Sequence, residues 1–154
     1  MRDIRSSSLP TQTSLSGCPL SEVRDKLRSA GLRPTRQRVL LGWMLFGRAH
    51  RHVCAEDLFE EATKARAGLS QATVYNTLRQ FTDAGLLRQV HMAADRAYFD
   101  TNVQEHHHFV VEGEGRIIDV PEMALALTEM PTAPAGFAIA GIDVIVRLRR
   151  VDEA

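Results

Sequence analysis

The hydrophobic pattern of the chain changes its period at Gly85, and this change narrows the possible folds more than any other feature. Before Gly85 apolar residues recur at helical spacing, and after it they alternate as in a strand. Helices are predicted over residues 19–30, 35–46, 55–67 and 71–84. Two strands, joined by a short turn, are predicted over residues 86–92 and 96–100. Helices followed by a hairpin, in this order, are typical of a winged helix-turn-helix.

Residues at the helix ends support these bounds. Pro19 and Pro34 suit the first turn of a helix, where a missing N–H costs nothing. Ser70 is a good N-cap, and Gly31 and Gly68 are typical of helix C-termini. The apolar residues that recur at helical spacing in the second helix are Val39, Leu40, Trp43, Met44 and Phe46. The residues expected to face inward from the third helix are Leu58, Phe59, Ala62 and Ala65.

The C-terminal part predicts a second, smaller α/β domain. Strands are expected over residues 107–113, 116–120 and 137–149, with a helix over residues 121–130. So short a segment buries little surface alone, so we expect its core to be completed in a homodimer or a higher oligomer. The expected fold class is therefore α+β. The expected parts are a disordered tail over 1–18, a winged-helix domain over 19–99 and an α/β dimerisation domain over 100–154.

The net charge of the chain is zero, but its two parts differ in sign. Residues 1–99 carry 15 Lys and Arg against 9 Asp and Glu, and residues 100–154 carry 4 against 10. The asymmetry predicts a basic binding domain followed by an acidic one. The sequence has no apolar run near 18 residues and no signal-peptide pattern, so no membrane partner is expected. Two cysteines make no disulfide framework, which favours a cytoplasmic location.

The predicted helix over 71–84 has a polar face suited to the major groove of DNA. The residues predicted to contact bases or backbone there are Gln71, Thr73, Tyr75, Asn76 and Arg79. Phosphate contacts are predicted for Arg33, Arg36 and Arg38. The expected partner is a palindromic operator in double-stranded DNA, which a dimer would bind. The alternative is a small α+β domain that binds no ligand.

Three consecutive histidines predict a metal site. His106 and His108 share one face of the expected strand, and His107 points the opposite way. The other candidate ligands are His52, Asp100 and Asp119. A set of nitrogen and oxygen donors without thiolate suits Fe²⁺, Mn²⁺ or Zn²⁺. The alternative is a solvated edge strand with ordinary carboxylates at its ends.

Several segments together resemble the ferric uptake regulator superfamily over residues 20 to about 149. They are GLRPTRQRVLL, HVCAEDLFEEA, LSQATVYNTLRQFTDAGLL and YFDTNVQEHHHFVVEGEGRIIDV. The resemblance implies a homodimeric winged-helix regulator, not an enzyme. The spacing within the dimer would depend on whether the metal is bound. It implies a regulatory metal site made by His52, Asp100, His106, His108 and Asp119. It also implies base contacts by Tyr75 and a minor-groove contact by Arg33.

Departures from the superfamily pattern are also informative. Val111 and Glu114 stand where a C-x-x-C pair is usual, and no cysteine follows Cys54. A structural zinc site of four cysteines is therefore excluded by the number of cysteines. Asn76 replaces an arginine that is frequent in iron-uptake members, which predicts a different operator preference. Ile142 stands where a second metal site often has a histidine.

The motifs H-H-H, T-V-Y-N-T-L, Y-F-D-T-N and V-R-L-R resemble the iron response regulator subgroup. This resemblance implies a regulator of iron and haem homeostasis that is active under low iron and inactivated by haem binding. The implied partner is haem or the haem-synthesis machinery. The implied haem ligands are Cys18, in a Cys-Pro pair, and His106, His107 and His108. One alternative is a metal-dependent, peroxide-sensing repressor of the same superfamily. A remote alternative is a non-haem iron oxygenase with a facial set of two histidines and one carboxylate.

Overall fold

The computed structural model describes residues 20–91, 96–121 and 128–151. The chain divides into two compact units, Met1–Val103 and Gln104–Ala154. The division falls a few residues beyond the expected boundary at residue 99. The helix expected over 121–130 lies mostly outside the described residues, as do the tail and the hairpin turn. Among the described residues, no helix is both long and apolar enough to cross a membrane.

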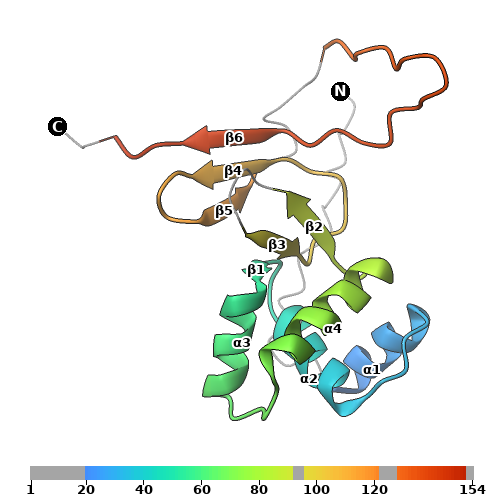
Figure 1. Cartoon of the computed structure of the whole chain (residues 1–154), viewed down its shortest axis with the longest axis vertical. Coiled ribbons are helices and arrows are strands. Elements are labelled where there is room, and N and C mark those ends of the chain that lie inside the picture. Colours follow the sequence, from blue (N-terminus) through green and yellow to red (C-terminus); the bar gives the residue numbers. More distant parts are fainter. Residues whose placement is uncertain (1–19, 92–95, 122–127, 152–154) are drawn as a thin grey trace, which may run out of the picture. The chain divides into compact units, whose positions relative to one another are not determined.

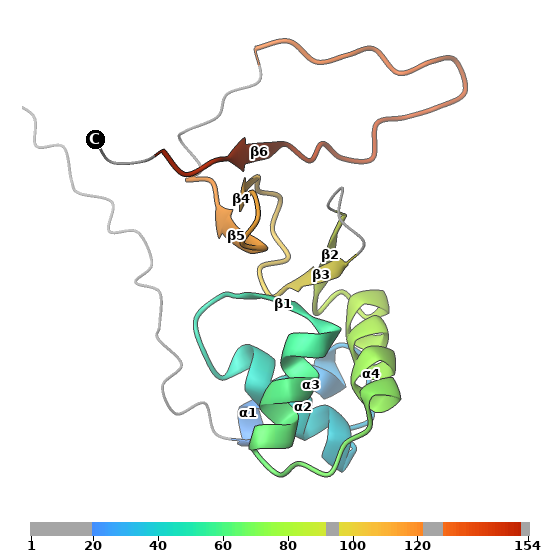
Figure 2. The same ribbon diagram turned by 60° about the vertical axis from the view of Figure 1, so that its left-hand side comes forward.

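The first unit contains four helices and a small sheet (Figure 1). Its helices are α1 (Leu20–Ser29), α2 (Arg36–Phe46), α3 (Ala55–Lys64) and α4 (Gln71–Asp83). Its strands are β1 (His52–Cys54), β2 (Arg88–His91) and β3 (Ala97–Asp100). Within this unit the helices gather on one side and the strands lie together on the other, as Figure 2 also shows. The winged helix-turn-helix order predicted from the hydrophobic period is therefore confirmed.

The sheet has the order β1-β3-β2, and both pairs are antiparallel. In its register Asp100 lies opposite His52 on β1 and opposite Arg88 on β2. β1 is absent from the sequence prediction, because three residues are too few to show an alternating pattern. The strand nevertheless joins the connection between α2 and α3 to the hairpin, and so brings His52 to the end of β3.

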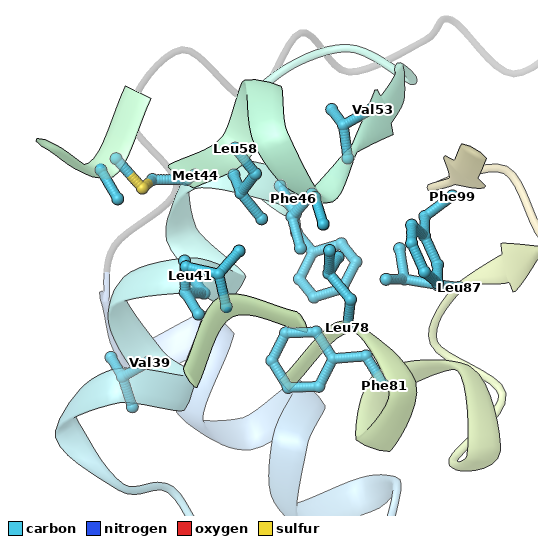
Figure 3. Close-up of a cluster of buried hydrophobic side chains, with 14 of the residues drawn as sticks. Val39, Leu41, Met44, Phe46, Val53, Leu58, Leu78, Phe81, Leu87 and Phe99 are labelled. Atoms are coloured by element: carbon cyan, nitrogen blue, oxygen red, sulfur yellow. The ribbon is translucent and has the colours of Figure 1, made fainter. Parts of the chain in front are cut away.

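The core of the first unit is built from all four helices and the sheet (Figure 3). Phe46 of α2 and Phe81 of α4 meet at its centre, with ring centroids 5.8 Å apart. Phe99 reaches the same core from β3. Trp43, which shares the helical spacing of the apolar residues of α2, is 42% exposed. α2 is apolar around most of its circumference, so spacing alone does not select its buried face, which includes Leu41.

Helix α3 ends earlier than predicted. Its last residue is Lys64, and the expected inward residue Ala65 is exposed at the C-cap. Arg66 follows with φ of +53°, the left-handed conformation. The chain turns there rather than at Gly68. A side chain with a Cβ in this conformation costs about 1 kcal/mol relative to glycine, so the turn at Arg66 has no explanation in local propensity.

The second unit contains a three-stranded sheet of order β5-β4-β6. Its strands are β4 (His108–Val111), β5 (Arg116–Asp119) and β6 (Ile145–Leu148). β4 pairs antiparallel with β5 and parallel with β6. The strand predicted over 137–149 is thus too long. β4 offers only four residues for pairing, and residues 137–143 have no strand beside them in the described part of the chain.

Candidate functional site

Helix α4 presents a polar surface outside the core of the first unit. Ser70 caps it, with its Oγ accepting a hydrogen bond from the Thr73 amide at 3.1 Å. Its inward residues are Val74, Thr77, Leu78 and Phe81. The outward residues Gln71, Tyr75, Asn76 and Arg79 are exposed, and Tyr75 is 47% exposed. Thr73 is half-buried, and its hydroxyl lies 2.8 Å from Ser70 Oγ, so this predicted DNA contact also belongs to the cap.

Arg38 connects the start of α2 to α4. Its Nε donates to Gln80 Oε1 at 3.0 Å, and its Nη1 donates to the Arg33 carbonyl at 2.9 Å. A groove of about 280 Å³ lies beside it, lined by Thr35, Gln37, Arg38, Thr73, Asn76, Thr77 and Gln80. The predicted phosphate contacts Arg33 and Arg36 are exposed. The surface of this unit therefore places guanidinium groups beside an exposed polar helix.

His52 and Asp100 form the first group of predicted metal ligands. Their positions face each other across β1 and β3, and His52 Nε2 lies 3.2 Å from Asp100 Oδ2. The other oxygen of Asp100 accepts a hydrogen bond from the Asn102 amide at 2.8 Å. The Asp100 side chain is buried. A carboxylate orientated from one side by an amide can offer its second oxygen to a cation.

Arg51, next to His52, holds the short strand β1 in place. Its amide donates to Thr101 Oγ1 at 2.9 Å, and its carbonyl accepts from the Thr101 amide at 3.1 Å. Its guanidinium binds both carboxylate oxygens of Glu61 on α3. It also donates to the Met44 carbonyl on α2 at 3.4 Å. Sequence reasoning did not identify this residue, because its partners come together only in the fold.

His106, His108 and Asp119 form the second group of predicted ligands, within the second unit. His108 on β4 lies opposite Asp119 on β5. The rings of His106 and His108 have centroids 4.5 Å apart. Asp119 Oδ1 lies 3.3 Å from His106 Nε2 and 3.9 Å from His108 Nε2. The structure thus brings together the three predicted ligands of this unit around one carboxylate oxygen.

The hydrogen bond made by one ring nitrogen of His106 determines whether the other nitrogen, which faces Asp119, carries a hydrogen or a lone pair. His106 Nδ1 lies 2.7 Å from the Gln104 carbonyl oxygen, which only accepts hydrogen bonds, so Nδ1 carries the hydrogen. In the neutral ring Nε2 is then an acceptor that faces a carboxylate oxygen. A cation between them, either a proton or a metal ion, converts this repulsion into attraction. The geometry therefore fits a metal ion.

His107 immediately precedes β4 and has contacts of its own. Its Nδ1 accepts a hydrogen bond from the Val144 amide at 3.3 Å. The side chain borders a cavity of about 460 Å³, which is lined also by Glu105, Met130, Ile139, Ala140, Gly141 and Ile142. His107 is therefore separate from the group of His106, His108 and Asp119. Cys18, the other predicted haem ligand, lies outside the described residues.

A family model described as "Ferric uptake regulator family" matches residues 29–147, which is most of the chain. The chain belongs to the ferric uptake regulator family. A relative named "Peroxide-responsive repressor PerR", from Staphylococcus epidermidis, is 33% identical over 100 residues. The matched stretch spans 65% of this chain and 66% of the relative, which is just under two thirds of its length.

Solved structures in the family support the same assignment. The ferric uptake regulator from Pseudomonas aeruginosa with manganese is 26% identical, with a TM-score of 0.61. The similarity covers 82% of this chain and 96% of that one. The regulator from Vibrio cholerae is 21% identical with a TM-score of 0.64, covering 82% and 98% of the two chains, which supports the fold.

Proposed function

We propose that this chain is a DNA-binding transcriptional regulator whose DNA affinity depends on a bound divalent metal. The observation that carries the proposal is the placement of two imidazole nitrogens 3.3 and 3.9 Å from one Asp119 oxygen. Membership of the ferric uptake regulator family supports it, as does the manganese in the Pseudomonas aeruginosa relative. The named relatives are regulators and repressors rather than enzymes.

DNA recognition is proposed to use the outward surface of α4. An exposed helix of this kind fits the major groove, where Gln and Asn side chains pair with adenine and Arg with guanine. Gln71, Asn76 and Arg79 supply these groups, and Tyr75 supplies an exposed aromatic ring beside them. Arg33, Arg36 and Arg38 would hold the phosphates. Two copies in a homodimer would read the two halves of a palindromic operator.

The metal is proposed to take ligands from both groups, with His52 and Asp100 joining His106, His108 and Asp119. Neither group alone gives a divalent ion the four to six ligands it normally takes. The combined set has two carboxylates, which balance the charge of the ion. Its nitrogen and oxygen donors suit Fe²⁺ or Mn²⁺, and Zn²⁺ is also compatible.

Such an ion would couple metal binding to DNA binding. Asp100 ends β3 and His52 lies on β1, so both ligands belong to the sheet of the unit that carries α4. Binding to the second unit as well would restrict the orientation of α4. A dimer in which both copies of α4 are already held in one orientation loses less conformational entropy when it binds the two half-sites. Metal would therefore raise DNA affinity.

Selection of duplexes from a random library, followed by anisotropy titrations with Mn²⁺, tests the proposal. Wild-type affinity is expected to rise at least tenfold at saturating Mn²⁺. Asp119→Asn should remove the response to metal, while Tyr75→Ala should lower affinity about tenfold or more at every metal concentration. Glu60→Gln, an exposed carboxylate on α3, is the matched control and should behave as wild type. Failure of the wild-type protein to select any duplex would overturn the proposal.

Peroxide sensing is a second candidate, favoured by the similarity to the peroxide-responsive repressor. Fe²⁺ held by these ligands would promote the two-electron oxidation of a neighbouring imidazole by hydrogen peroxide, with one peroxide oxygen added to the ring and the other released as water. His52 and His106 are the expected targets. Mass spectrometry of the iron-loaded protein after peroxide should find oxygen added to one of them, together with lost DNA binding. Unmodified histidines with full DNA binding would exclude this candidate.

Haem sensing under low iron is the finer function that the subgroup resemblance implies, and it stays a prediction. The hydrogen bond from the Val144 amide to His107 Nδ1 leaves the hydrogen of the neutral ring on Nε2. His107 Nε2 then has no lone pair to offer haem iron unless the hydrogen bond from Val144 is broken. Absorption spectra with haem should differ between wild type, Cys18→Ala and a variant with alanine at residues 106–108. Three identical spectra would contradict haem ligation by these residues.

A further inference from the structure

Three arginines border a second concavity of the first unit, on the other side of the start of α2 from the groove beside Arg38. Its volume is about 490 Å³. Its lining consists of Leu20, Arg24, Pro34, Arg36, Val39, Leu40, Ala65, Arg66 and Ala67. The lining includes no acidic residue, and the described residues show no ion pair for Arg24, Arg36 or Arg66. An apolar floor with an unbalanced cationic rim fits a partner that carries anionic groups.

Arg66 occupies a position that glycine holds at the ends of two other helices of this unit. α1 and α4 each end in a Schellman turn with Gly31 or Gly85 in the left-handed conformation. At the end of α3 the same turn is closed by hydrogen bonds from Arg66 to Thr63 and from Ala67 to Ala62, both 2.9 Å. The chain thus tolerates a strained backbone at Arg66 and keeps its side chain on the concavity.

The start of α2 adds positive potential at the same place. Its first turn contains no acid but carries Arg36 and Arg38, whereas the first turn of α3 carries Glu56 and Asp57. Cations at a helix N-terminus oppose the helix dipole and weaken the helix. Together with the N-terminal amides they attract anions. Two separate local departures, at Arg66 and at Arg36, therefore point to an anionic partner.

We infer that Arg24, Arg36 and Arg66 hold the sugar-phosphate backbone of duplex DNA, outside the surface of α4 that would read bases. The two concavities flank one helix start, which a continuous row of phosphates can follow, whereas a single small anion would fill only one. The apolar floor suits the carbon face of a deoxyribose. The inference rests on the proposed DNA-binding function and assigns new contacts to Arg24 and Arg66.

Salt dependence of binding to a mixed-sequence duplex of about 30 base pairs tests this inference. One lost phosphate contact makes the slope of log affinity against log salt less negative by about 0.9. Arg66→Gly should show this change and a roughly fivefold to tenfold lower affinity at low salt. The same variant should unfold about 4 °C higher, because glycine relieves the left-handed strain. Arg66→Lys should retain most of the slope.

Arg48→Gln is the matched control, since Arg48 is an exposed arginine just beyond the opposite end of α2. It should leave the slope unchanged, which separates a local contact from a loss of net charge. An unchanged slope for Arg66→Gly, with intact wild-type binding, would overturn the inference. The inference would also be overturned if Arg66→Gly lost binding of inorganic phosphate but kept wild-type binding of the duplex, because the concavity would then hold a small anion rather than DNA. Absence of duplex binding by the wild type would instead overturn the proposed function.

Discussion

Cys54 illustrates how the surroundings of one residue determine its chemistry. Its Sγ accepts a hydrogen bond from the Asp57 amide at 3.4 Å and so caps α3. The side chain is fully buried, and burial raises the pKa of the thiol from 9.0 to about 11. The thiolate is the reactive form, so Cys54 acts as a small core residue and a cap rather than as a nucleophile.

Thiol labelling tests this assignment, with Cys18→Ala used so that only Cys54 reports. At pH 8 the folded protein should react with a disulfide reagent about ten times more slowly than a small free thiol, because the raised pKa of the thiol lowers the thiolate fraction more than it raises thiolate nucleophilicity. Burial should slow the reaction further. Addition of denaturant should restore the ordinary rate. Immediate labelling of the folded protein would contradict the buried position.

At the scale of elements, the short strand β1 depends on contacts outside the sheet. Arg51 joins it to the end of β3 through Thr101 and to α3 through Glu61. Hydrogen bonds from Arg51 are the main cause of the lowered pKa of the Glu61 carboxyl. A carboxyl whose pKa is lower in the folded state stabilises the fold above its unfolded pKa. This stabilisation is lost as pH falls through the folded pKa.

Glu61→Gln should therefore lower the free energy of unfolding at pH 7 by about 1 kcal/mol, with the loss shrinking as pH falls below about 4. Urea unfolding of both proteins at several pH values between 3 and 7 measures the difference. Glu60→Gln is the control, because its ion pair with Lys64 is exposed and screened by solvent, so this variant should unfold like wild type at every pH. A difference for Glu61→Gln that stays constant across this range would show that the ion pair with Arg51 is not its source.

At the scale of the whole molecule, the second unit leaves large apolar side chains in solvent. Phe137 is 77% exposed, and Met130 and Ile139 are also exposed. Its described sheet has only three short strands, which bury little surface. Exposed apolar groups of this size in a small unit indicate that another surface covers them. This supports the homodimer that the proposed operator binding requires.

Phe137→Asp is expected to shift the protein towards the monomer, because a charge in an apolar contact loses its hydration without gaining a partner. Light scattering after size-exclusion chromatography at several protein concentrations measures the mass. Trp43→Ser is the control, since Trp43 is a partly exposed aromatic in the first unit. It should leave the mass unchanged. An unaltered dimer in the Phe137→Asp variant would place the interface elsewhere.

The amino-acid sequence by itself determined the four helices of the first unit, its hairpin strands and the fold class. The reason is that helical spacing, the Ser70 cap and the glycines at residues 31 and 85 are local signals that report local hydrogen bonding. It also predicted that His106 and His108 lie on one side of the chain, but the reason was incomplete, because His106 precedes β4, which begins at His108. It misplaced the end of α3, since Gly68 is a stronger stop signal than Arg66.

Only the tertiary structure decided the contacts that join distant segments. β1 forms because β3 provides its hydrogen bonds, and that pairing alone puts His52 opposite Asp100. The register of β4 and β5 similarly sets Asp119 beside the histidines. Cross-strand register depends on which strand edges pair. The sequence of a three-residue strand is too short to indicate its partner. The ligand types were therefore present in the sequence, but their geometry within each unit came from the pairing of strands.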